Sequence, residues 1–195
     1  MQNMIIENNK EPFYHTIIHD YFTPEERELI WKELEALHPR LEGPEVTGDP
    51  RASKLKQGLY LDSEYENRRD HSNILSLSRK IFDIEKLGQI KENIFSKYLN
   101  VCNLDYTLLN YYPTQSNYKD HRDVSVLSST ICLWKEPKQF TGGNLFFKEY
   151  NYTPLMMNNS MILFPGFELH EILNTEVTKE RFGRYAISQF YLING

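Results

Sequence analysis

Cysteine is scarce in this chain, and long apolar runs are missing altogether. The two cysteines, Cys102 and Cys132, favour free thiols in a reducing compartment over a disulfide framework. No apolar stretch approaches the ~18 residues that a membrane-spanning helix needs. Residues 1–12 are polar and lack the apolar core of a signal peptide. We therefore expect a soluble, cytoplasmic protein with no membrane partner.

An excess of positive charge is also absent. The chain has 27 acidic and 22 basic residues and a net charge of −5, so no overall field attracts a phosphate backbone, and nucleic acid is not the expected partner. What the chain does have is aromatic residues, with 13 tyrosines and 11 phenylalanines among 195 residues. This composition is typical of a compact, β-rich globule, and the length suits one domain, residues 1–195.

The first half of the chain predicts helices that support a sheet. A strand is expected at 13–19, followed by a helix from 24 to about 37, with Thr23 as N-cap, Pro24 at the first helical position and Glu26 completing a capping box. Pro39 ends this helix. Its apolar residues recur every three to four positions and should pack on the core: Leu29, Ile30, Leu34 and Leu37.

Two connections separate the other elements expected in this half. The segment 40–56 contains Gly43, Pro44, Gly48 and Pro50 and reads as a long loop, either a lid that contacts substrate or an ordinary surface loop. The charged segment 62–71 reads as a solvated connection after a short strand at 57–61. Helices are expected at 72–82 and 85–99, because apolar residues recur there at helical spacing.

The second half of the chain is rich in short β-type runs. These lie at 106–112, 126–134, 143–150, 161–164 and 184–193, separated by glycine, proline and asparagine. Helices followed by many strands predict an α+β domain, with helical support over about 13–100 and a sandwich or barrel of the jelly-roll kind over about 103–193.

The strongest chemical signal is the sequence His121-Arg122-Asp123, with His170 further along. Residues two apart in an extended segment point to the same side, so His121 and Asp123 can bind one ion. His170 would then come from another strand. Two histidines and one carboxylate leave three positions of an octahedral ion open, which is typical of non-haem Fe(II) oxygenases and not of closed zinc sites. A His-Arg-Asp sequence alone is also compatible with a solvated turn.

Four motifs follow one another in a recognisable order. They are the His-x-Asp pair, a turn at Gly142-Gly143-Asn144-Leu145, a turn at Phe164-Pro165-Gly166 before His170, and Gly183-Arg184-Tyr185-Ala186-Ile187-Ser188. This order resembles the Fe(II)- and 2-oxoglutarate-dependent dioxygenases, specifically the prolyl 4-hydroxylase-like branch. The resemblance covers 103–192 and extends loosely to the helical part. It implies a double-stranded β-helix, the cupin-like jelly roll, with supporting helices.

The resemblance also implies roles for individual residues. His121, Asp123 and His170 match the Fe(II) ligands, and Arg184 matches the basic residue that pairs with the far carboxylate of 2-oxoglutarate, for which a guanidinium fork is suited. Such an enzyme uses O₂, releases succinate and CO₂, and hydroxylates a C–H bond. The branch suggests a prolyl residue in a peptide or protein, while a free amino acid or another small molecule stays open as substrate.

The remaining cosubstrate residues are less directly matched. Arg181 fits the family's spacing from His170 better than Arg184, but Arg184 begins the β-type run in which Arg184, Ala186 and Ser188 share a small or polar face. Cys132 stands where family members often have a tyrosine. Tyr112, or its neighbour Tyr111, could supply that hydroxyl or be a core aromatic residue.

Three other functions are compatible with parts of the sequence. One is a metal-binding jelly roll of cupin type that does not use 2-oxoglutarate, for which Arg184 would be unnecessary. Another is a nucleic-acid demethylase, which the charge disfavours and which would require a second arginine where Phe190 stands. A third is an inactive relative, although all three ligand-type residues are present.

Overall fold

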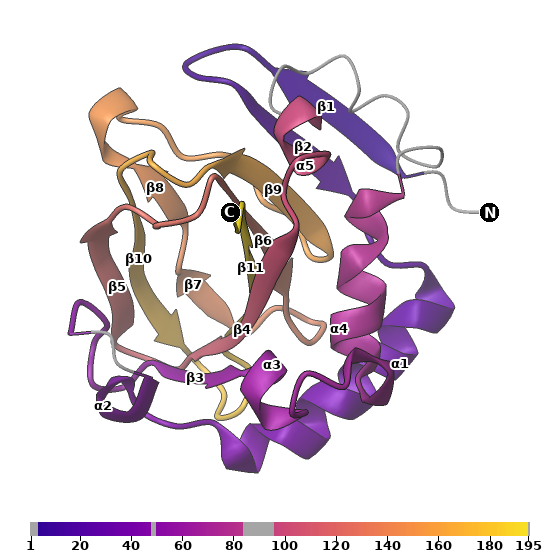
Figure 1. Ribbon diagram of the computed structural model, residues 1–195. Coiled ribbons are helices and arrows are strands. Elements are labelled where there is room, and N and C mark those ends of the chain that lie inside the picture. Colours follow the sequence, from indigo (N-terminus) through magenta and orange to yellow (C-terminus); the bar gives the residue numbers. More distant parts are fainter. Residues whose placement is uncertain (1–3, 48–49, 84–95, 195) are drawn as a thin grey trace.

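The larger of two antiparallel sheets forms the centre of the molecule (Figure 1). A computed structural model describes residues 4–47, 50–83 and 96–194. Over these ranges the larger sheet, here called sheet A, has seven strands in the order β1-β2-β9-β6-β11-β4-β3. Their bounds are β1 (Ile5–Asn9), β2 (His15–His19), β9 (Ser160–Pro165), β6 (Leu127–Leu133), β11 (Arg184–Leu192), β4 (Leu104–Tyr112) and β3 (Gln57–Tyr60).

The smaller sheet, sheet B, faces one side of sheet A (Figure 1). Within the described ranges it has the order β5-β10-β7, and β8 also pairs with β10. Side chains from both sheets line a common cavity between them. The bounds of these strands are β5 (Ser116–His121), β10 (His170–Val177), β7 (Phe140–Gly142) and β8 (Leu145–Phe147).

Helices cover the other side of sheet A, as Figure 1 shows for α1 (Pro24–Leu37) and α4 (Asn73–Ser78). The expected start of α1 is confirmed, because the Thr23 side chain accepts from the Glu26 backbone N–H while the Glu26 carboxylate accepts from that of Thr23. A short 3-10 turn, η1 (His38–Arg40), follows α1.

The packing stripe of α1 differs from the expected one at one position. Leu29 is 46% exposed, whereas Glu33 is buried. The Glu33 carboxylate accepts hydrogen bonds from the Ser72 hydroxyl and the Ile74 backbone N–H at the start of α4, and from the Tyr65 hydroxyl. A buried carboxylate is tolerated when donors surround it in this way, so α1 is attached to α4 by a polar contact as well as by apolar packing.

Alternation along the strands separates two apolar regions. On β11, Tyr185 and Ile187 point to the helices, where they join a core with Leu34 of α1. Ala186 points the other way, into a second cluster between the sheets that includes Phe147 of β8. Successive side chains of a strand face opposite sides, so each inner strand of sheet A contributes to both regions. The cavity therefore borders the inner cluster and not the core beneath the helices.

Several connections are more structured than the sequence predicted. The segment 40–56 contains α2 (Pro44–Thr47) and is tied to the sheets by bridges from Glu42 to Gly58 and from Ala52 to Tyr118. The segment 62–71 is not a purely solvated connection. It includes most of α3 (Leu61–Glu64) and the turn η2 (Arg69–His71), and Asp62 is buried against Arg69.

Other boundaries shift by smaller amounts. The helix expected at 72–82 is α4 followed by η3 (Arg79–Phe82), and the strand expected at 143–150 ends at Phe147 and passes into η5 (Lys148–Tyr150). Of the helix expected at 85–99, residues 85–95 lie outside the described ranges, and α5 (Ser96–Leu99) is its described part. The polar strand β1 was not predicted; its residues pair along β2.

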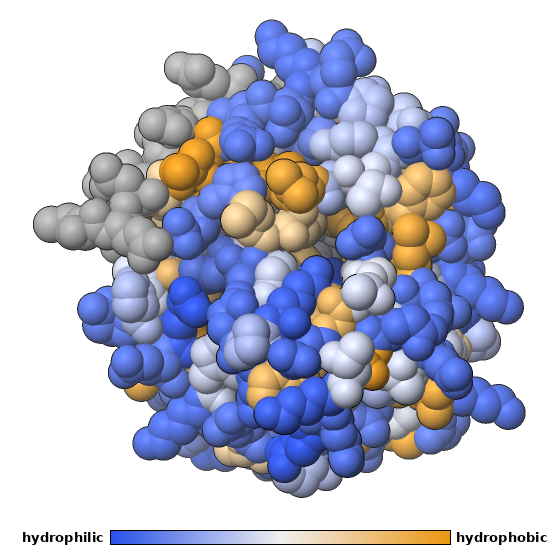
Figure 2. All heavy atoms as spheres, turned by 180° about the vertical axis from the view of Figure 1, so that it is seen from behind, coloured by the Kyte–Doolittle hydropathy of each residue, from blue (hydrophilic) through white to orange (hydrophobic). Residues whose placement is uncertain are grey.

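Polar side chains dominate the back of the molecule, and apolar ones form small patches between them (Figure 2). Cys102 and Cys132 are both free, as expected from their number. None of the helices in the described ranges is long and apolar enough to cross a membrane.

Candidate active site

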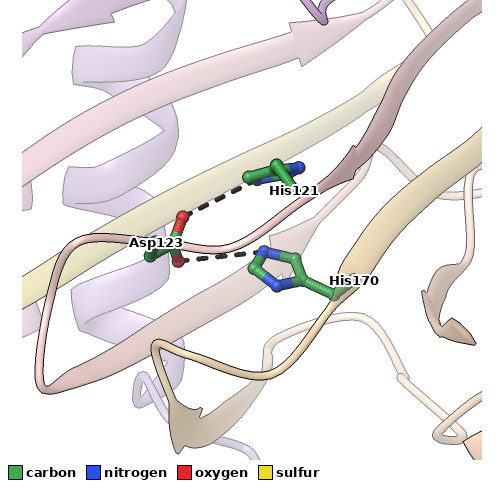
Figure 3. A group of neighbouring side chains, drawn as sticks. All are labelled: His121, Asp123 and His170. Carbon is green, nitrogen blue, oxygen red and sulfur yellow. Dashed lines mark ion pairs between the residues drawn. The ribbon is translucent and has the colours of Figure 1, made fainter. Parts of the chain in front are cut away.

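His121, Asp123 and His170 converge at one end of sheet B (Figure 3). His121 is the last residue of β5 and His170 the first of β10, and the two residues are partners in the strand register. Asp123 lies two residues beyond the end of β5. Its backbone N–H donates to the carbonyl of Gly166. One potential ligand atom from each side chain lies within 4.8 Å of the others, close enough to bind a single ion.

The two imidazoles are oriented by the same local contact. Nδ1 of His121 lies 2.8 Å from the Lys119 carbonyl, and Nδ1 of His170 lies 2.8 Å from the Glu168 carbonyl. A carbonyl can only accept, so each Nδ1 carries a proton, and Nε2 is the nitrogen of each neutral ring that can bind a cation. The Nε2 atoms lie 3.6 and 3.8 Å from the Asp123 carboxylate oxygens. These distances are longer than those of hydrogen bonds, and the three side chains point their ligand atoms toward a common position that a cation could occupy.

Serines orient the Asp123 carboxylate. The Ser128 hydroxyl lies 2.5 Å from Asp123 Oδ2, and Ser125 Oγ lies 2.7 Å from Ser128 Oγ. The chain opposite is also close, because a Cβ on Gly166 would lie 2.2 Å from the Ser125 carbonyl oxygen. Only glycine fits there, and this close approach keeps the turn before His170 against the turn that carries Asp123.

Burial keeps the imidazole of His170 neutral. His170 is 5% exposed, and burial lowers its pKa to about 4, so its imidazole is neutral at pH 7. Tyr118 stacks on His121 with ring centroids 4.0 Å apart, and Phe164 contacts His170 edge-on at 5.0 Å. These rings limit water access to the histidines on the sides that do not face Asp123.

A buried arginine lies in the same cavity. Arg184 is the first residue of β11 and is only 3% exposed. Within the described ranges its Nη1 has no hydrogen-bond partner and no carboxylate pairs with the guanidinium, which contacts the Tyr112 side chain. Isolated buried cations are costly, so this guanidinium is suited to an anionic ligand. Arg181, the alternative anchor, is exposed on the loop before β11.

The cavity joins the predicted residues into one site. It contains about 430 Å³ of empty space, its mouth included, and its lining includes all six candidate residues: Tyr112, His121, Asp123, His170, Arg184 and Ser188. The Ser188 hydroxyl contacts Thr130 Oγ1 and Asn110 Nδ2, each at 3.3 Å. The three metal-type side chains and Arg184 therefore border a single space.

Strand β6 contributes more to the site than the sequence indicated, because only Cys132 of this strand was placed beside the cosubstrate. Its inward side chains are Ser128, Thr130 and Cys132, and they contact Asp123, Ser188 and Arg184 respectively. The available signal was small side chains at every second position of the strand, at Ser128, Thr130 and Cys132. Each of these three side chains therefore supports one predicted residue.

A wider cleft opens from the metal-type residues to the surface. It shares His121, Asp123 and Tyr118 with the inner cavity and holds about 910 Å³ of empty space, its mouth included. Sheet A contributes one wall, formed by Tyr60, Tyr106, Leu108, Phe190 and Leu192. Thr47, Arg51 and Lys56 of the segment 40–56 line the cleft as well, so this segment borders the site.

Comparison with solved structures identifies the fold. No family model and no curated protein matches the sequence. A prolyl-4-hydroxylase from Pseudomonas putida superposes with a TM-score of 0.60 at 13% identity, over 93% of each chain. A Trichoplax adhaerens prolyl hydroxylase, solved with a hypoxia inducible factor peptide fragment, gives 0.59 at 12% identity, over 91% of this chain and 83% of that one. The chain has the fold of the prolyl hydroxylases.

A third match agrees with this assignment. The viral collagen prolyl hydroxylase of Paramecium Bursaria Chlorella virus-1, solved as a 2-oxoglutarate complex, gives a TM-score of 0.52 at 11% identity, over 94% of this chain and 98% of that one. The resemblance noted from the four motifs is thus confirmed at the level of the fold.

Cys132, which stands where family members often have a tyrosine, contacts Arg184. Its sulfur lies 3.1 Å from Arg184 Nη2 and accepts a hydrogen bond from it.

Proposed function

We propose that this protein is an Fe(II)- and 2-oxoglutarate-dependent dioxygenase that hydroxylates a C–H bond of its substrate. The observation that carries the proposal is one cavity that combines three converging metal-type acceptors with a buried arginine lacking a carboxylate partner in the described ranges. A metal-binding jelly roll that does not use 2-oxoglutarate would account for the three metal-type side chains but not for the buried arginine.

His121, Asp123 and His170 would bind the iron. Their donor set is two neutral imidazoles and one carboxylate, and it leaves coordination positions free for other ligands. Ser128 would keep the Asp123 carboxylate turned toward the metal, because its hydroxyl occupies one side of Oδ2. The chemistry that Fe(II) and 2-oxoglutarate supply when bound is conversion of 2-oxoglutarate and O₂ to succinate and CO₂, with one oxygen atom inserted into a C–H bond.

Arg184 would bind the far carboxylate of 2-oxoglutarate. A guanidinium offers two parallel N–H donors to a carboxylate, and in a buried site this contact is stronger than in water. Tyr112 of β4, whose ring centroid lies 5.2 Å from the Arg184 guanidinium carbon, lines the same space, as does Ser188, which follows Arg184 and Ala186 on the inward face of β11. They would contact the body of the cosubstrate.

The outer cleft would take the prime substrate. Its wall of Tyr60, Tyr106 and Phe190 is aromatic and half-open, which suits the flat apolar ring of proline. A relative of this fold was solved with a peptide fragment, and the cleft has room for a side chain on an extended backbone. We therefore propose a prolyl residue of a peptide or protein as the substrate, and the segment 40–56 as a border that closes over it.

We further propose that residues 1–195 form a single domain in which sheets A and B are the two halves of a double-stranded β-helix. The common cavity and the antiparallel pairing in both sheets support this interpretation.

The test is succinate formation. Purified protein with Fe(II), ascorbate and O₂ should convert 2-oxoglutarate to succinate, and proline-containing peptides should accelerate the conversion. His170→Ala should abolish it, and the Arg181→Ala variant serves as a matched control with a normal rate. If the iron-loaded wild type binds 2-oxoglutarate but forms no succinate with or without peptides, the protein is not an active dioxygenase.

A further inference from the structure

A second, smaller cavity lies behind Arg184 and has no role in the function proposed above. This rear pocket shares Arg184 and Leu145 with the central cavity and contains none of the three metal-type side chains. It holds about 310 Å³ of empty space, its mouth included. Its other lining residues are Cys132, Trp134, Lys138, Phe140, Gly142, Gly143, Asn144, Pro154 and Met156. Arg184 therefore separates the central cavity from the rear pocket and lines both.

The Arg184 guanidinium makes only a weak hydrogen bond on the side that faces the rear pocket. Arg184 Nη2 donates to the Cys132 sulfur at 3.1 Å, and a thiol is a poor acceptor. Nη1 has no partner in the described ranges. Beside the arginine stem, Gly143 (φ +66°) leaves room, because a Cβ at that position would lie only 3.4 Å from Arg184 Cδ. The guanidinium contacts the Cys132 sulfur on one side and the Tyr112 side chain on the other, and an incoming carboxylate that replaces these contacts would let it turn toward the rear pocket.

The rear pocket would also receive negative charge favourably. No acidic side chain lines it in the described part of the chain. Its exposed rim carries Lys138, whose ammonium lies 4.5 Å from the Phe140 ring centroid and 5.0 Å from that of Trp134. If the far carboxylate of a bound diacid moves from the central cavity toward the rear pocket, its distance from the metal-type residues increases and it approaches the Lys138 ammonium.

We propose that this site accepts six-carbon 2-oxo diacids as well as 2-oxoglutarate, and that Cys132 is the residue that determines this tolerance. The inference rests on the proposed function and extends it to the choice of cosubstrate. A longer acid would occupy the same metal end and push its far carboxylate and the guanidinium toward the rear pocket. The short side chain of Cys132 leaves the room for that shift, which a larger side chain would fill.

Calorimetric titration in the absence of oxygen tests the proposal without turnover. The wild-type chain, loaded with Mn(II) in place of iron, is titrated with 2-oxoglutarate and then with 2-oxoadipate, its six-carbon homologue. A pocket with a rigid end discriminates against one methylene by about 10–200-fold. We expect the two dissociation constants of the wild type to agree within about fivefold, because the end of this pocket can move.

Variants at position 132 then locate the cause. Cys132→Phe fills the rear pocket and should raise the ratio of the two constants into the 10–200-fold range, whereas Cys132→Ala keeps the pocket open and should leave the ratio low. Cys132→Val serves as a smaller filler if the phenylalanine variant does not fold, and thermal unfolding monitors the fold of each.

The outcomes separate the two proposals. If 2-oxoglutarate itself does not bind to the metal-loaded wild type, the proposed function fails. If it binds while 2-oxoadipate binds more than about fivefold more weakly, the function stands and the tolerance is refuted. If both acids bind and the ratio is the same in the alanine and in the filled variants, Cys132 does not determine the length.

Discussion

Arg184→Met should separate the ligand-binding role of this residue from any structural role. The guanidinium is 3% exposed and has no carboxylate partner in the described ranges, so the methionine, of similar length and apolar, removes a desolvated charge without leaving another charge unpaired. Exchanges of this kind are neutral or stabilising by about 1–4 kcal/mol. Without ligand, the variant should therefore be at least as stable as the wild type.

Its affinity for 2-oxoglutarate should change in the opposite direction. Loss of the charge-assisted contact should weaken binding by about a hundredfold or more, which corresponds to roughly 2.7 kcal/mol. In thermal unfolding with Mn(II), 2-oxoglutarate at about 100 times its Kd should stabilise the wild type by ~2.7 kcal/mol and should leave Arg184→Met almost unchanged. Arg181→Ala, on the exposed loop, should behave as the wild type.

Two results would refute this reasoning. A larger loss of affinity in Arg181→Ala than in Arg184→Met would move the anchor to the loop. A destabilisation of ligand-free Arg184→Met by about 3–5 kcal/mol would mean that the charge already has a compensating partner.

Further predictions concern the metal, the acid range and the cleft. Asp123→Ala should abolish the binding of one divalent ion per chain while the fold is retained, and Ser128→Ala should weaken metal binding about 10–100-fold. Anaerobic titration with Mn(II) measures both affinities. An unchanged metal affinity in Asp123→Ala would place the metal elsewhere. Burial lowers the pKa of His15, so its contribution to stability is complete above the unfolded value of about 6.5 and is lost as the pH falls below it. Below pH 6.5 the free energy of unfolding should therefore decrease less steeply with falling pH in His15→Gln than in the wild type, by up to about 1.4 kcal/mol per pH unit. Denaturant titrations at several pH values measure both slopes, and equal slopes in the two proteins would contradict this prediction. Deletion of residues 45–49 should raise KM for the prime substrate far more than for 2-oxoglutarate, and equal changes in both constants would make the segment an ordinary surface loop.

Short-range patterns were sufficient to predict part of this structure. The capping box of Thr23 and Glu26 is complete within four residues, so the start of α1 was read correctly. The alternation of Arg184, Ala186 and Ser188 depends only on strand geometry, and these residues do share the face that lines the cavity. Features that depend on the residues of a single helix or strand could therefore be predicted from the sequence.

The missed features depend on partners that are distant in sequence. Glu33 is buried because Ser72 and Ile74 donate to it, and an isolated helix pattern assigns a glutamate to solvent. Ser128 and Thr130 contact site residues only after the chain brings Asp123 and Ser188 to them. The segment 40–56 became partly ordered through bridges to other strands. Its glycines and prolines predict only the lack of regular structure.

The position of β11 has a consequence for biosynthesis. β11 is the last strand of sheet A in sequence, yet it lies between β6 and β4 and is hydrogen-bonded to both. Until residues 184–192 leave the ribosome, the two halves of the sheet have unpaired edges and the apolar faces of β4 and β6 lack their neighbour. Such edges favour aggregation. A nascent chain stalled before β11 should therefore be a strong client for chaperones, and strand closure would deliver Arg184 to its cavity in the same event that completes the sheet.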